Sequence, residues 1–377
     1  MPKLTLNDIC QYRNENMLST DLSDNVYIST ETMQPNREGI SSSDIVTPTT
    51  KKVKAFYPGD ILVSNIRPYF KKIWRATFAG GCSNDVLVFS PKCNSEYLYW
   101  LLSTDSFFNY MMATSKGTKM PRGDKKAIMK YIVPDHSDKE QRQIASFLNP
   151  LQNKIALNNR INDYLAELGK MIWAQTAKQA AKTVKIAEVA ADIVTGKTPS
   201  TKKPDNYGEE YPFITIPDMH SAVWLCSTER CLSEVGNSSQ PKKLVQRGSV
   251  LVSCIATVGL VGIVQKPSHF NQQINAVIPA NEDDEFYLYY AMHSIKQELL
   301  GIGATGSATL NVNKGAFSNI EIPWPERSAM DTYVRTVEPL FKAIEANTLE
   351  SLRLQELRDT LLPKLMSGEI DVSKVEI

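Results

Sequence analysis

Cationic, amide and aromatic side chains that suit a nucleic acid lie together in two short segments of the first half of the chain. An arginine can donate two hydrogen bonds to guanine, and lysines neutralise phosphates. A solvated run of charge is the alternative explanation for each segment. The residues that we predict to contact DNA here are Asn65, Arg67, Tyr69, Lys71, Lys72, Lys116, Lys119 and Arg122.

The second half of the chain offers candidates with far less charge. Its loops present hydroxyl and amide groups, and three lysines upstream could bind phosphates. Because phosphate contacts position a protein while base-edge contacts specify the sequence, residue types alone do not separate the two roles. The predicted residues are Thr257, Ser307, Asn311, Asn313 and Lys314, with Lys197, Lys202 and Lys203 as the phosphate candidates.

The residue pattern gives no support for catalysis, a metal or a bound cofactor. Gly196-Lys197-Thr198 is similar to the end of a phosphate-binding loop, but Ala191 stands where a glycine is required and Pro199 would disrupt the following helix. The four histidines show no ligand spacing, and the six cysteines include no CxxC pair, which is typical of reduced, packed thiols. We therefore predict no catalytic, cofactor-binding or metal-binding residue.

The elements that must position these side chains occur twice. PGDILVSNI around Gly59 recurs as RGSVLVSCI around Gly248, an offset of 189 residues that also joins Pro134 to Pro323. The helical stretches that follow keep the same offset. A constant offset over so long a stretch indicates a tandem duplication.

Each repeat begins with short β-type runs between Gly, Pro and Asn turns and ends in a long helical pattern. The predicted fold class is therefore α+β, with two tandem mixed α/β domains separated by two long helices. We place the first domain at residues 1–138, the central helix at 139–183, the second domain at 184–325 and the C-terminal helix at 326–377.

Both helical stretches carry apolar residues at heptad spacing with polar residues in the middle of the seam. Packing of each helix on its own domain is the simpler explanation. Two matched helices with polar positions at the same place favour mutual pairing, since a buried asparagine fixes register and partner. Chain direction then predicts an antiparallel coiled coil with a pseudo-twofold axis, which would hold the two domains at a fixed spacing. The predicted seam residues are Leu148, Leu151, Ile155, Asn158, Leu165, Val337, Leu340, Ile344, Asn347 and Leu354.

The overall composition predicts a globular, cytoplasmic protein. The net charge is only +1, so charge neither proves nor excludes a nucleic-acid partner. No stretch of about 18 apolar residues and no signal-peptide pattern occurs, so no membrane contact is expected.

The order of domain, long helix, domain and long helix resembles the specificity subunit of type I restriction–modification systems, which has two target-recognition domains and two helical regions. The resemblance covers essentially the whole chain. Its most specific pieces are TGKTPS at Thr195–Ser200, NYGEEYPFITIPDM at Asn206–Met219, KEQRQIASFL from Lys139 and LRDTLLPKLMSGEI from Leu357. The second helix start, ERSAMDTYV, lacks the family's usual Glu-Gln pair, and the first domain lacks the Gly-x-Thr-Pro-Ser turn.

The resemblance implies a subunit without chemistry of its own that recognises a bipartite target in double-stranded DNA. Its implied partners are two modification subunits, which methylate adenine with S-adenosylmethionine, and restriction subunits, which are ATP-dependent translocases and nucleases. In agreement, the sequence has no glycine-rich turn for the methyl donor and no Asn/Asp-Pro-Pro-aromatic motif. The alternatives are a self-contained DNA methyltransferase or nuclease, and a coiled-coil scaffold without a DNA role.

Overall fold

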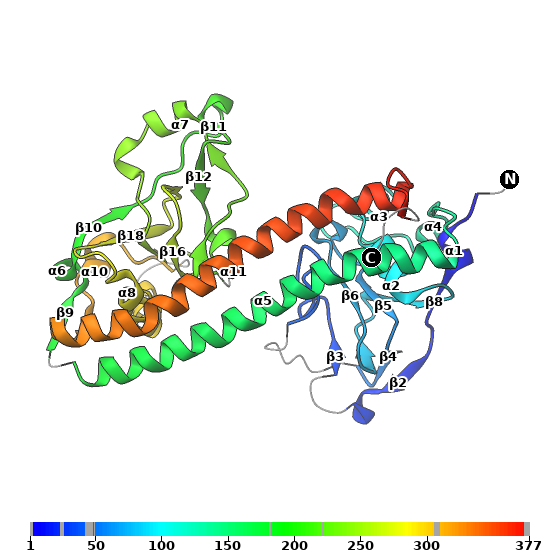
Figure 1. The fold of residues 1–377 in the computed structure, drawn as a ribbon, viewed down its shortest axis with the longest axis horizontal. Helices are drawn as coiled ribbons and strands as arrows, with labels where there is room; N and C mark the ends of the chain where they lie inside the picture. Colours follow the sequence, from blue (N-terminus) through cyan, green and yellow to red (C-terminus); the bar gives the residue numbers. More distant parts are fainter. Residues whose placement is uncertain are drawn as a thin grey trace. The chain divides into compact units, whose positions relative to one another are not determined.

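The computed structural model describes residues 3–22, 26–41, 48, 50–180, 182–220, 222–304 and 310–372. The chain forms two compact units: unit 1 is Met1–Lys154 with Leu354–Ile377, and unit 2 is Ile155–Arg353. Both units contain part of each of two 41-residue helices, α5 (Asp138–Lys178) and α11 (Arg327–Ser367) (Figure 1). Unit 1 is therefore discontinuous in sequence, whereas unit 2 is one continuous stretch.

Unit 1 is built on two four-stranded sheets. The first has the order β1-β8-β5-β6 and is antiparallel throughout; the second has the order β2-β4-β7-β3, in which β3 is parallel to β7. β5 is buried at all four positions, which explains its unbroken apolar run Ile-Leu-Val. The strands are β1 (Cys10–Tyr12), β2 (Asn16–Leu18), β3 (Tyr27–Ile28), β4 (Lys52–Phe56), β5 (Ile61–Ser64), β6 (Ile73–Arg75), β7 (Gly80–Cys82) and β8 (Val86–Pro91); the helices are α1 (Leu6–Ile9), η1 (Ser19–Asp21), η2 (Pro68–Phe70), α2 (Ser95–Leu102), α3 (Asp105–Ala113) and α4 (Lys125–Ile128).

Unit 2 repeats the first sheet of unit 1 and extends it. β10-β18-β15-β16 has the same strand order and the same antiparallel pairing, and β13 is added parallel to β16. A second sheet has the order β11-β14-β12-β17, and β19 pairs with β9. The shared strand order confirms the predicted tandem duplication. The strands are β9 (Lys182–Lys185), β10 (Ala190–Thr195), β11 (Tyr207–Gly208), β12 (Tyr211–Ile214), β13 (Trp224–Leu225), β14 (Cys231–Leu232), β15 (Val250–Ser253), β16 (Val261–Val264), β17 (His269–Phe270), β18 (Ile274–Pro279) and β19 (Glu321–Trp324); the helices are α6 (Ile186–Val189), η3 (Pro204–Asn206), η4 (Ile216–Met219), α7 (Glu234–Ser238), η5 (Pro241–Lys243), α8 (Glu285–Ser294), α9 (Lys296–Gly303) and α10 (Lys314–Ser318).

The two long helices pair antiparallel through polar contacts inside unit 2. Asn158 is fully buried, and its Nδ2 donates to Glu350 Oε2 at 2.8 Å and to Ser351 Oγ at 3.3 Å. Asn347 Nδ2 donates to Asn162 Oδ1 at 2.9 Å. Residue numbers thus rise along α5 as they fall along α11, as the predicted antiparallel coiled coil requires. The amide of Asn347 faces Asn162 rather than the amide of Asn158.

The hydrophobic core of each unit contains segments of both long helices. Ile144 and Leu148 of α5 lie with Leu362 of α11 in the core of unit 1, and Val337 and Ile344 of α11 lie in the core of unit 2. The helices therefore pair with each other and also pack on the domains, so the two explanations weighed from the sequence hold together. Among the predicted seam residues, those that are buried are Leu148, Ile155, Asn158, Val337 and Ile344, and those that are half-buried are Leu151, Leu165, Leu340, Asn347 and Leu354.

The central helix is shorter than the predicted 139–183. α5 ends at Lys178, and Lys182–Lys185 forms strand β9, so the second α/β domain starts before the predicted residue 184. The reason is a ladder of main-chain hydrogen bonds to β19, a strand that lies far along the chain. Local helical propensity cannot show such a distant partner.

Candidate nucleic-acid interface

The two segments predicted in the first domain come together in one surface, which we call loop pair 1 (residues 65–72 and 116–123). The N–H of Arg67 donates to the carbonyl of Pro121 at 2.9 Å. Ile66 forms an isolated antiparallel bridge with Arg122. Main-chain hydrogen bonds therefore hold the two loops side by side, independently of their side chains.

Exposed aromatic and apolar groups accompany the cationic ones on loop pair 1. Tyr69 and Phe70 are 49% and 40% exposed, and their ring centroids are 4.7 Å apart. Lys119 and Met120 are exposed on the other loop. Phe70 and Met120 lie within the two predicted segments but were not singled out as contact residues. Solvent-exposed rings of this kind can stack on nucleobases.

Three of the predicted side chains are buried or held inside unit 1. Asn65 is only 6% exposed, and its buried Oδ1, which lies beside Gly123, has no hydrogen-bond partner among the described residues. Lys72 Nζ donates to the carbonyl of Thr30 at 2.7 Å, and burial lowers the pKa of this amine. Lys71 Nζ lies 2.8 Å from Asp105 Oδ1. These residues shape the loop, while others contact the solvent.

The remaining cations of loop pair 1 differ in how they are held. Lys116 Nζ lies 2.7 Å from Asp124, and this ion pair, together with N–H groups at the start of α4, lowers the pKa of Asp124 to about 2. Arg122 Nη2 lies 3.2 Å from Asp85 Oδ1. Among the residues that the structure describes, the guanidinium of Arg67 has no hydrogen-bond or ion-pair partner, and its Nε is buried. Arg67 and Arg122 thus have donors available for a ligand.

Unit 2 builds the same frame, which we call loop pair 2 (residues 254–259 and 310–313). The N–H of Ala256 donates to the carbonyl of Leu310 at 3.0 Å. Ile255 forms an isolated antiparallel bridge with Asn311. Each of these contacts matches one in loop pair 1 at the offset of 189 residues.

The two loop pairs also share an unusual backbone conformation. Arg67 has φ 49° and Ala256 has φ 63°, so both residues adopt the left-handed region. A residue with a Cβ pays a steric cost there and adopts it only where surrounding contacts impose it. The duplicated frame has therefore kept a strained position while the side chain on it differs.

The candidates of unit 2 fall into two separate places. Thr257 and Asn311 are exposed on loop pair 2, whereas Ser307 lies outside the described residues. The main-chain N–H of Lys197 donates to the carbonyl of Phe270, next to the second sheet of the unit. No hydrogen bond or ion pair between described residues joins the upstream lysines to loop pair 2. These lysines, all exposed, are Lys197, Lys202 and Lys203.

Two further candidates of unit 2 have structural contacts. Asn313 Oδ1 accepts a hydrogen bond from the Ala316 N–H at 2.9 Å and so caps the N-terminus of α10. Asp124 caps α4 in unit 1 at the equivalent position. Lys314 Nζ lies 3.9 Å from Asp192. Asn313 therefore stabilises the helix that follows the loop, and its side-chain oxygen is already occupied.

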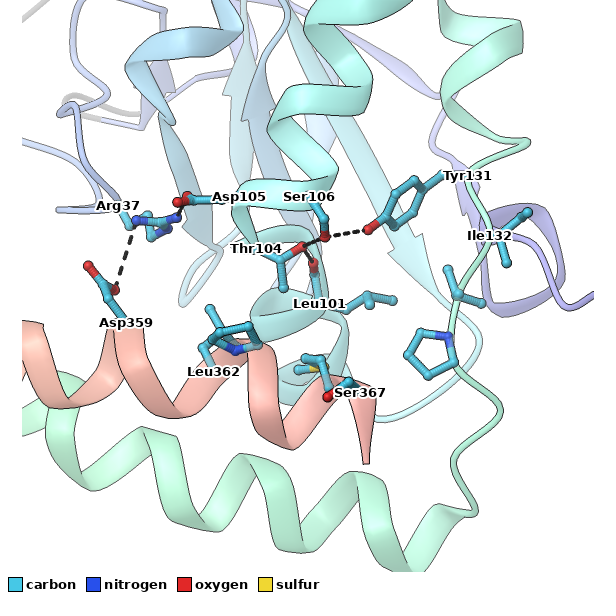
Figure 2. Close-up of a pocket in the computed structure, with 14 residues that line it drawn as sticks. Arg37, Leu101, Thr104, Asp105, Ser106, Tyr131, Ile132, Asp359, Leu362 and Ser367 are labelled. Atoms are coloured by element: carbon cyan, nitrogen blue, oxygen red, sulfur yellow. Dashed lines mark hydrogen bonds and ion pairs between the residues drawn. The ribbon is translucent and has the colours of Figure 1, made fainter. Parts of the chain in front are cut away.

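A cavity of about 460 Å³ lies in unit 1 between α3, the segment 131–134 and α11. Figure 2 shows Arg37 at one side of it, where its guanidinium pairs with Asp105 of α3 and with Asp359 of α11. Because Lys71 also pairs with Asp105, Arg37 connects loop pair 1 to α11. The lining is mainly apolar, and we assign no ligand to this cavity.

The His, Cys, Asp and Glu side chains of the described residues are dispersed. Among the described residues, no three His, Cys, Asp or Glu side chains gather as metal ligands. Within the same ranges, no helix has the length and apolar character needed to cross a membrane. All six cysteines are free, and burial raises the pKa of Cys10 and Cys254 to about 12, so these thiols are not nucleophilic at neutral pH.

Known proteins share both the sequence and the architecture of this chain. Residues 2–167 and 179–354 match the family described as the type I restriction modification DNA specificity domain. The type I restriction enzyme HindI specificity subunit of Haemophilus influenzae is 31% identical over 407 aligned positions, which cover 84% of this chain and 88% of that protein. The MjaVIII specificity subunit of Methanocaldococcus jannaschii is 22% identical over 388 positions, covering 93% and 87%.

A solved structure has the same fold. The S subunit of a type I restriction–modification system from M. genitalium aligns over 97% of this chain and 95% of its own length, with a TM-score of 0.57 and 13% identity. This likeness shows the fold, and the family match over both repeats together with the 31% identical relative shows the family. The chain belongs to the type I restriction–modification specificity subunits, which recognise DNA and are not themselves enzymes.

Proposed function

We propose that this specificity subunit recognises a bipartite target in double-stranded DNA and that each unit binds one half of it. The observation that carries the proposal is the pair of equivalent loop frames. They present Arg67 and Arg122 in unit 1 but Ala256 and Asn311 in unit 2. Equal frames with different side chains are what two different half-sequences require, because specificity depends on side-chain contacts with base edges.

We also propose that α5 and α11 fix the gap between the two half-sequences. Both helices contribute to the core of both units, and the polar contacts of Asn158 and Asn347 hold them in one register. Polar contacts of this kind specify register, since any slip would break the hydrogen bonds of Asn158 to Glu350 and Ser351 and of Asn347 to Asn162. The gap would then depend on helix length, at about 1.5 Å per residue.

The proposal includes partners that supply the chemistry. Two modification subunits would methylate adenine with S-adenosylmethionine, and restriction subunits would join the same scaffold, as membership of the family suggests. The six free thiols favour the reducing cytoplasm as the place where this assembly works. This chain would contribute DNA recognition and the arrangement of its partners.

The test is a map of methylated adenines in cells that carry this chain and its modification subunit. We expect one motif made of two short sequences separated by a gap of constant length. Cells with the modification subunit alone are the control and should show no such motif. A continuous motif would contradict recognition in two halves, and methylation by the purified chain with S-adenosylmethionine alone would support a self-contained methyltransferase. A complex that methylates DNA without any sequence preference would leave only a scaffold role.

A further inference from the structure

Arg122 and Asn311 occupy the same place in the two loop pairs. Arg122 forms an isolated bridge with Ile66 and follows Pro121, whose carbonyl accepts the N–H of Arg67. Asn311 forms an isolated bridge with Ile255 and follows Leu310, whose carbonyl accepts the N–H of Ala256. Arg67 and Ala256 both have a left-handed backbone conformation. The two side chains therefore leave equivalent points of equivalent backbones.

The guanidinium of Arg122 is held on one side only. Its Nη2 lies 3.2 and 3.4 Å from the two carboxylate oxygens of Asp85. The side chain of Arg122 is 55% exposed, and among the described residues its other nitrogens have no partner. Asp85 thus orients the planar group and leaves N–H donors directed away from the protein. Guanine offers two acceptors, N7 and O6, in the major groove, which match such a pair of donors.

Asn311 is exposed, and its side-chain amide makes no hydrogen bond within the described part of the chain. Neighbouring amides on the segment before β18 are occupied: Asn271 and Gln273 hydrogen-bond to each other, and Gln272 accepts from Thr198. An amide carries one donor edge and one acceptor edge. Adenine presents the complementary N7 acceptor and N6 donor in the major groove.

We infer that residues 122 and 311 determine one base pair in each half of the target, with Arg122 selecting a G·C pair and Asn311 an A·T pair. Asp85 acts as a positioning residue for Arg122. The inference rests on the proposed recognition of a bipartite target and adds the identity of one position in each half.

The test exchanges the two side chains. We expect R122N to replace G·C by A·T at one position of one half-sequence, and N311R to make the reverse change in the other half. The preference should shift roughly 5- to 150-fold at that position, the range for a good bidentate contact. The measurement is methylation mapping of cells carrying each variant with the modification subunit. Both substitutions are at exposed positions, so folding should be retained.

Two further variants make the outcome unambiguous. D85N should broaden the base preference at the position that R122N changes, and K126N, at an exposed lysine of the adjacent helix α4, should leave the motif unchanged. If R122N abolishes methylation, binding of the assembled variant to duplexes randomised at each target position replaces the map. Equal weakening for all bases, or an unchanged motif in R122N and N311R, would overturn the inference. A wild-type complex without a bipartite motif would instead refute the proposed function.

Discussion

Loop pair 1 and loop pair 2 share the main-chain contacts of Ile66 and Arg67 with those of Ile255 and Ala256, but the rest of the first loop differs. Position 67 of unit 1 carries an arginine where unit 2 has Ala256. Unit 1 then forms η2 with the exposed Tyr69 and Phe70, whereas the matching segment of unit 2 has no helix and is one residue shorter. Main-chain hydrogen bonds define both frames, so they do not depend on which side chains the loops carry. The difference indicates that the exposed side chains of these loops can vary without loss of the fold.

The contacts of the two units with α11 are more alike than the side chains of their loop pairs. Unit 1 uses Arg37, which pairs with Asp359 of that helix. Unit 2 uses Arg247, which makes two hydrogen bonds of 2.5 and 2.7 Å to Glu345 and lies 4.6 Å from the centroid of the Trp224 ring. Each domain thus contacts the shared helix through one arginine, although the two arginines come from different places in the repeat.

The largest expected effect is that of changing helix length. Inserting one heptad after Lys154 of α5 alone should prevent assembly of an active complex, because the pairing with α11 cannot be kept in both units. Matched insertions after Lys154 and after Arg353 should restore the pairing and lengthen the gap of the target. Seven residues add about 10.5 Å, or about three base pairs. Methylation mapping measures this, and an active single insertion with the original gap would exclude α5 and α11 as the spacer.

The next largest effect is expected on the free energy of unfolding when either of the two arginines that contact α11 is replaced by alanine. R37A should lower the free energy of unfolding by about 2–3 kcal/mol, because Arg37 is 7% exposed and its removal takes the donor from the buried carbonyl of Ser103 and breaks the contacts with Asp105 and Asp359. R247A should cost less, about 1 kcal/mol, since the side chain of Arg247 is 48% exposed. Denaturant unfolding of both variants checks the order. A larger loss in R247A would show that burial does not govern these contacts.

A smaller effect is expected from Arg67. R67A should weaken DNA binding of the assembled complex by about 1–3 kcal/mol. R67G also removes the guanidinium but relieves the left-handed strain, so equal weakening in both variants would assign the loss to the lost contact. The matched control is A256G in unit 2, which should bind as the wild type does. Wild-type affinity of R67G would place the guanidinium outside the interface.

The smallest effect concerns a carboxyl group at equivalent positions of the two repeats. Glu96 of unit 1 lies 3.3 Å from Arg75, whereas burial raises the pKa of Glu285 in unit 2 to about 7. A raised pKa favours the protonated acid in the folded state, so stability falls as pH rises from about 5 to 7. E285Q should remove this cost and raise stability at pH 8 by roughly 1 kcal/mol after solvent screening, with no gain at pH 4. E96Q, the matched control, should show no gain in stability at pH 8. The measurement is the melting temperature of both variants and of the wild type at pH 4 and pH 8.

The fold could be predicted from the sequence because its signals are periodic. The offset that joins Gly59 to Gly248 revealed the duplication, and heptad spacing revealed both helices. The shared strand order and the antiparallel helices confirm these predictions. The end of α5 was missed because strand β9 depends on a partner strand far along the chain.

The candidate site could be predicted only as a set of segments. Nothing in the sequence shows that Asp85 orients Arg122, because the two residues meet only through folding. The burial of Asn65 likewise depends on the neighbouring loop. The capping role of Asn313 was accessible, since an asparagine before a short helix is a common N-cap and Asp124 stands at the equivalent position.

The shared helices also determine the order in which the chain can fold as it leaves the ribosome. The core of unit 1 includes Leu362 and Leu365, which follow all of unit 2 in the sequence. Unit 2 is complete once residue 353 has emerged. The part of unit 1 that is translated before unit 2 must therefore wait until the whole of unit 2 and the second half of α11 have been synthesised, with part of its apolar core uncovered. Nascent chains of this subunit should depend on chaperones mainly through their N-terminal domain.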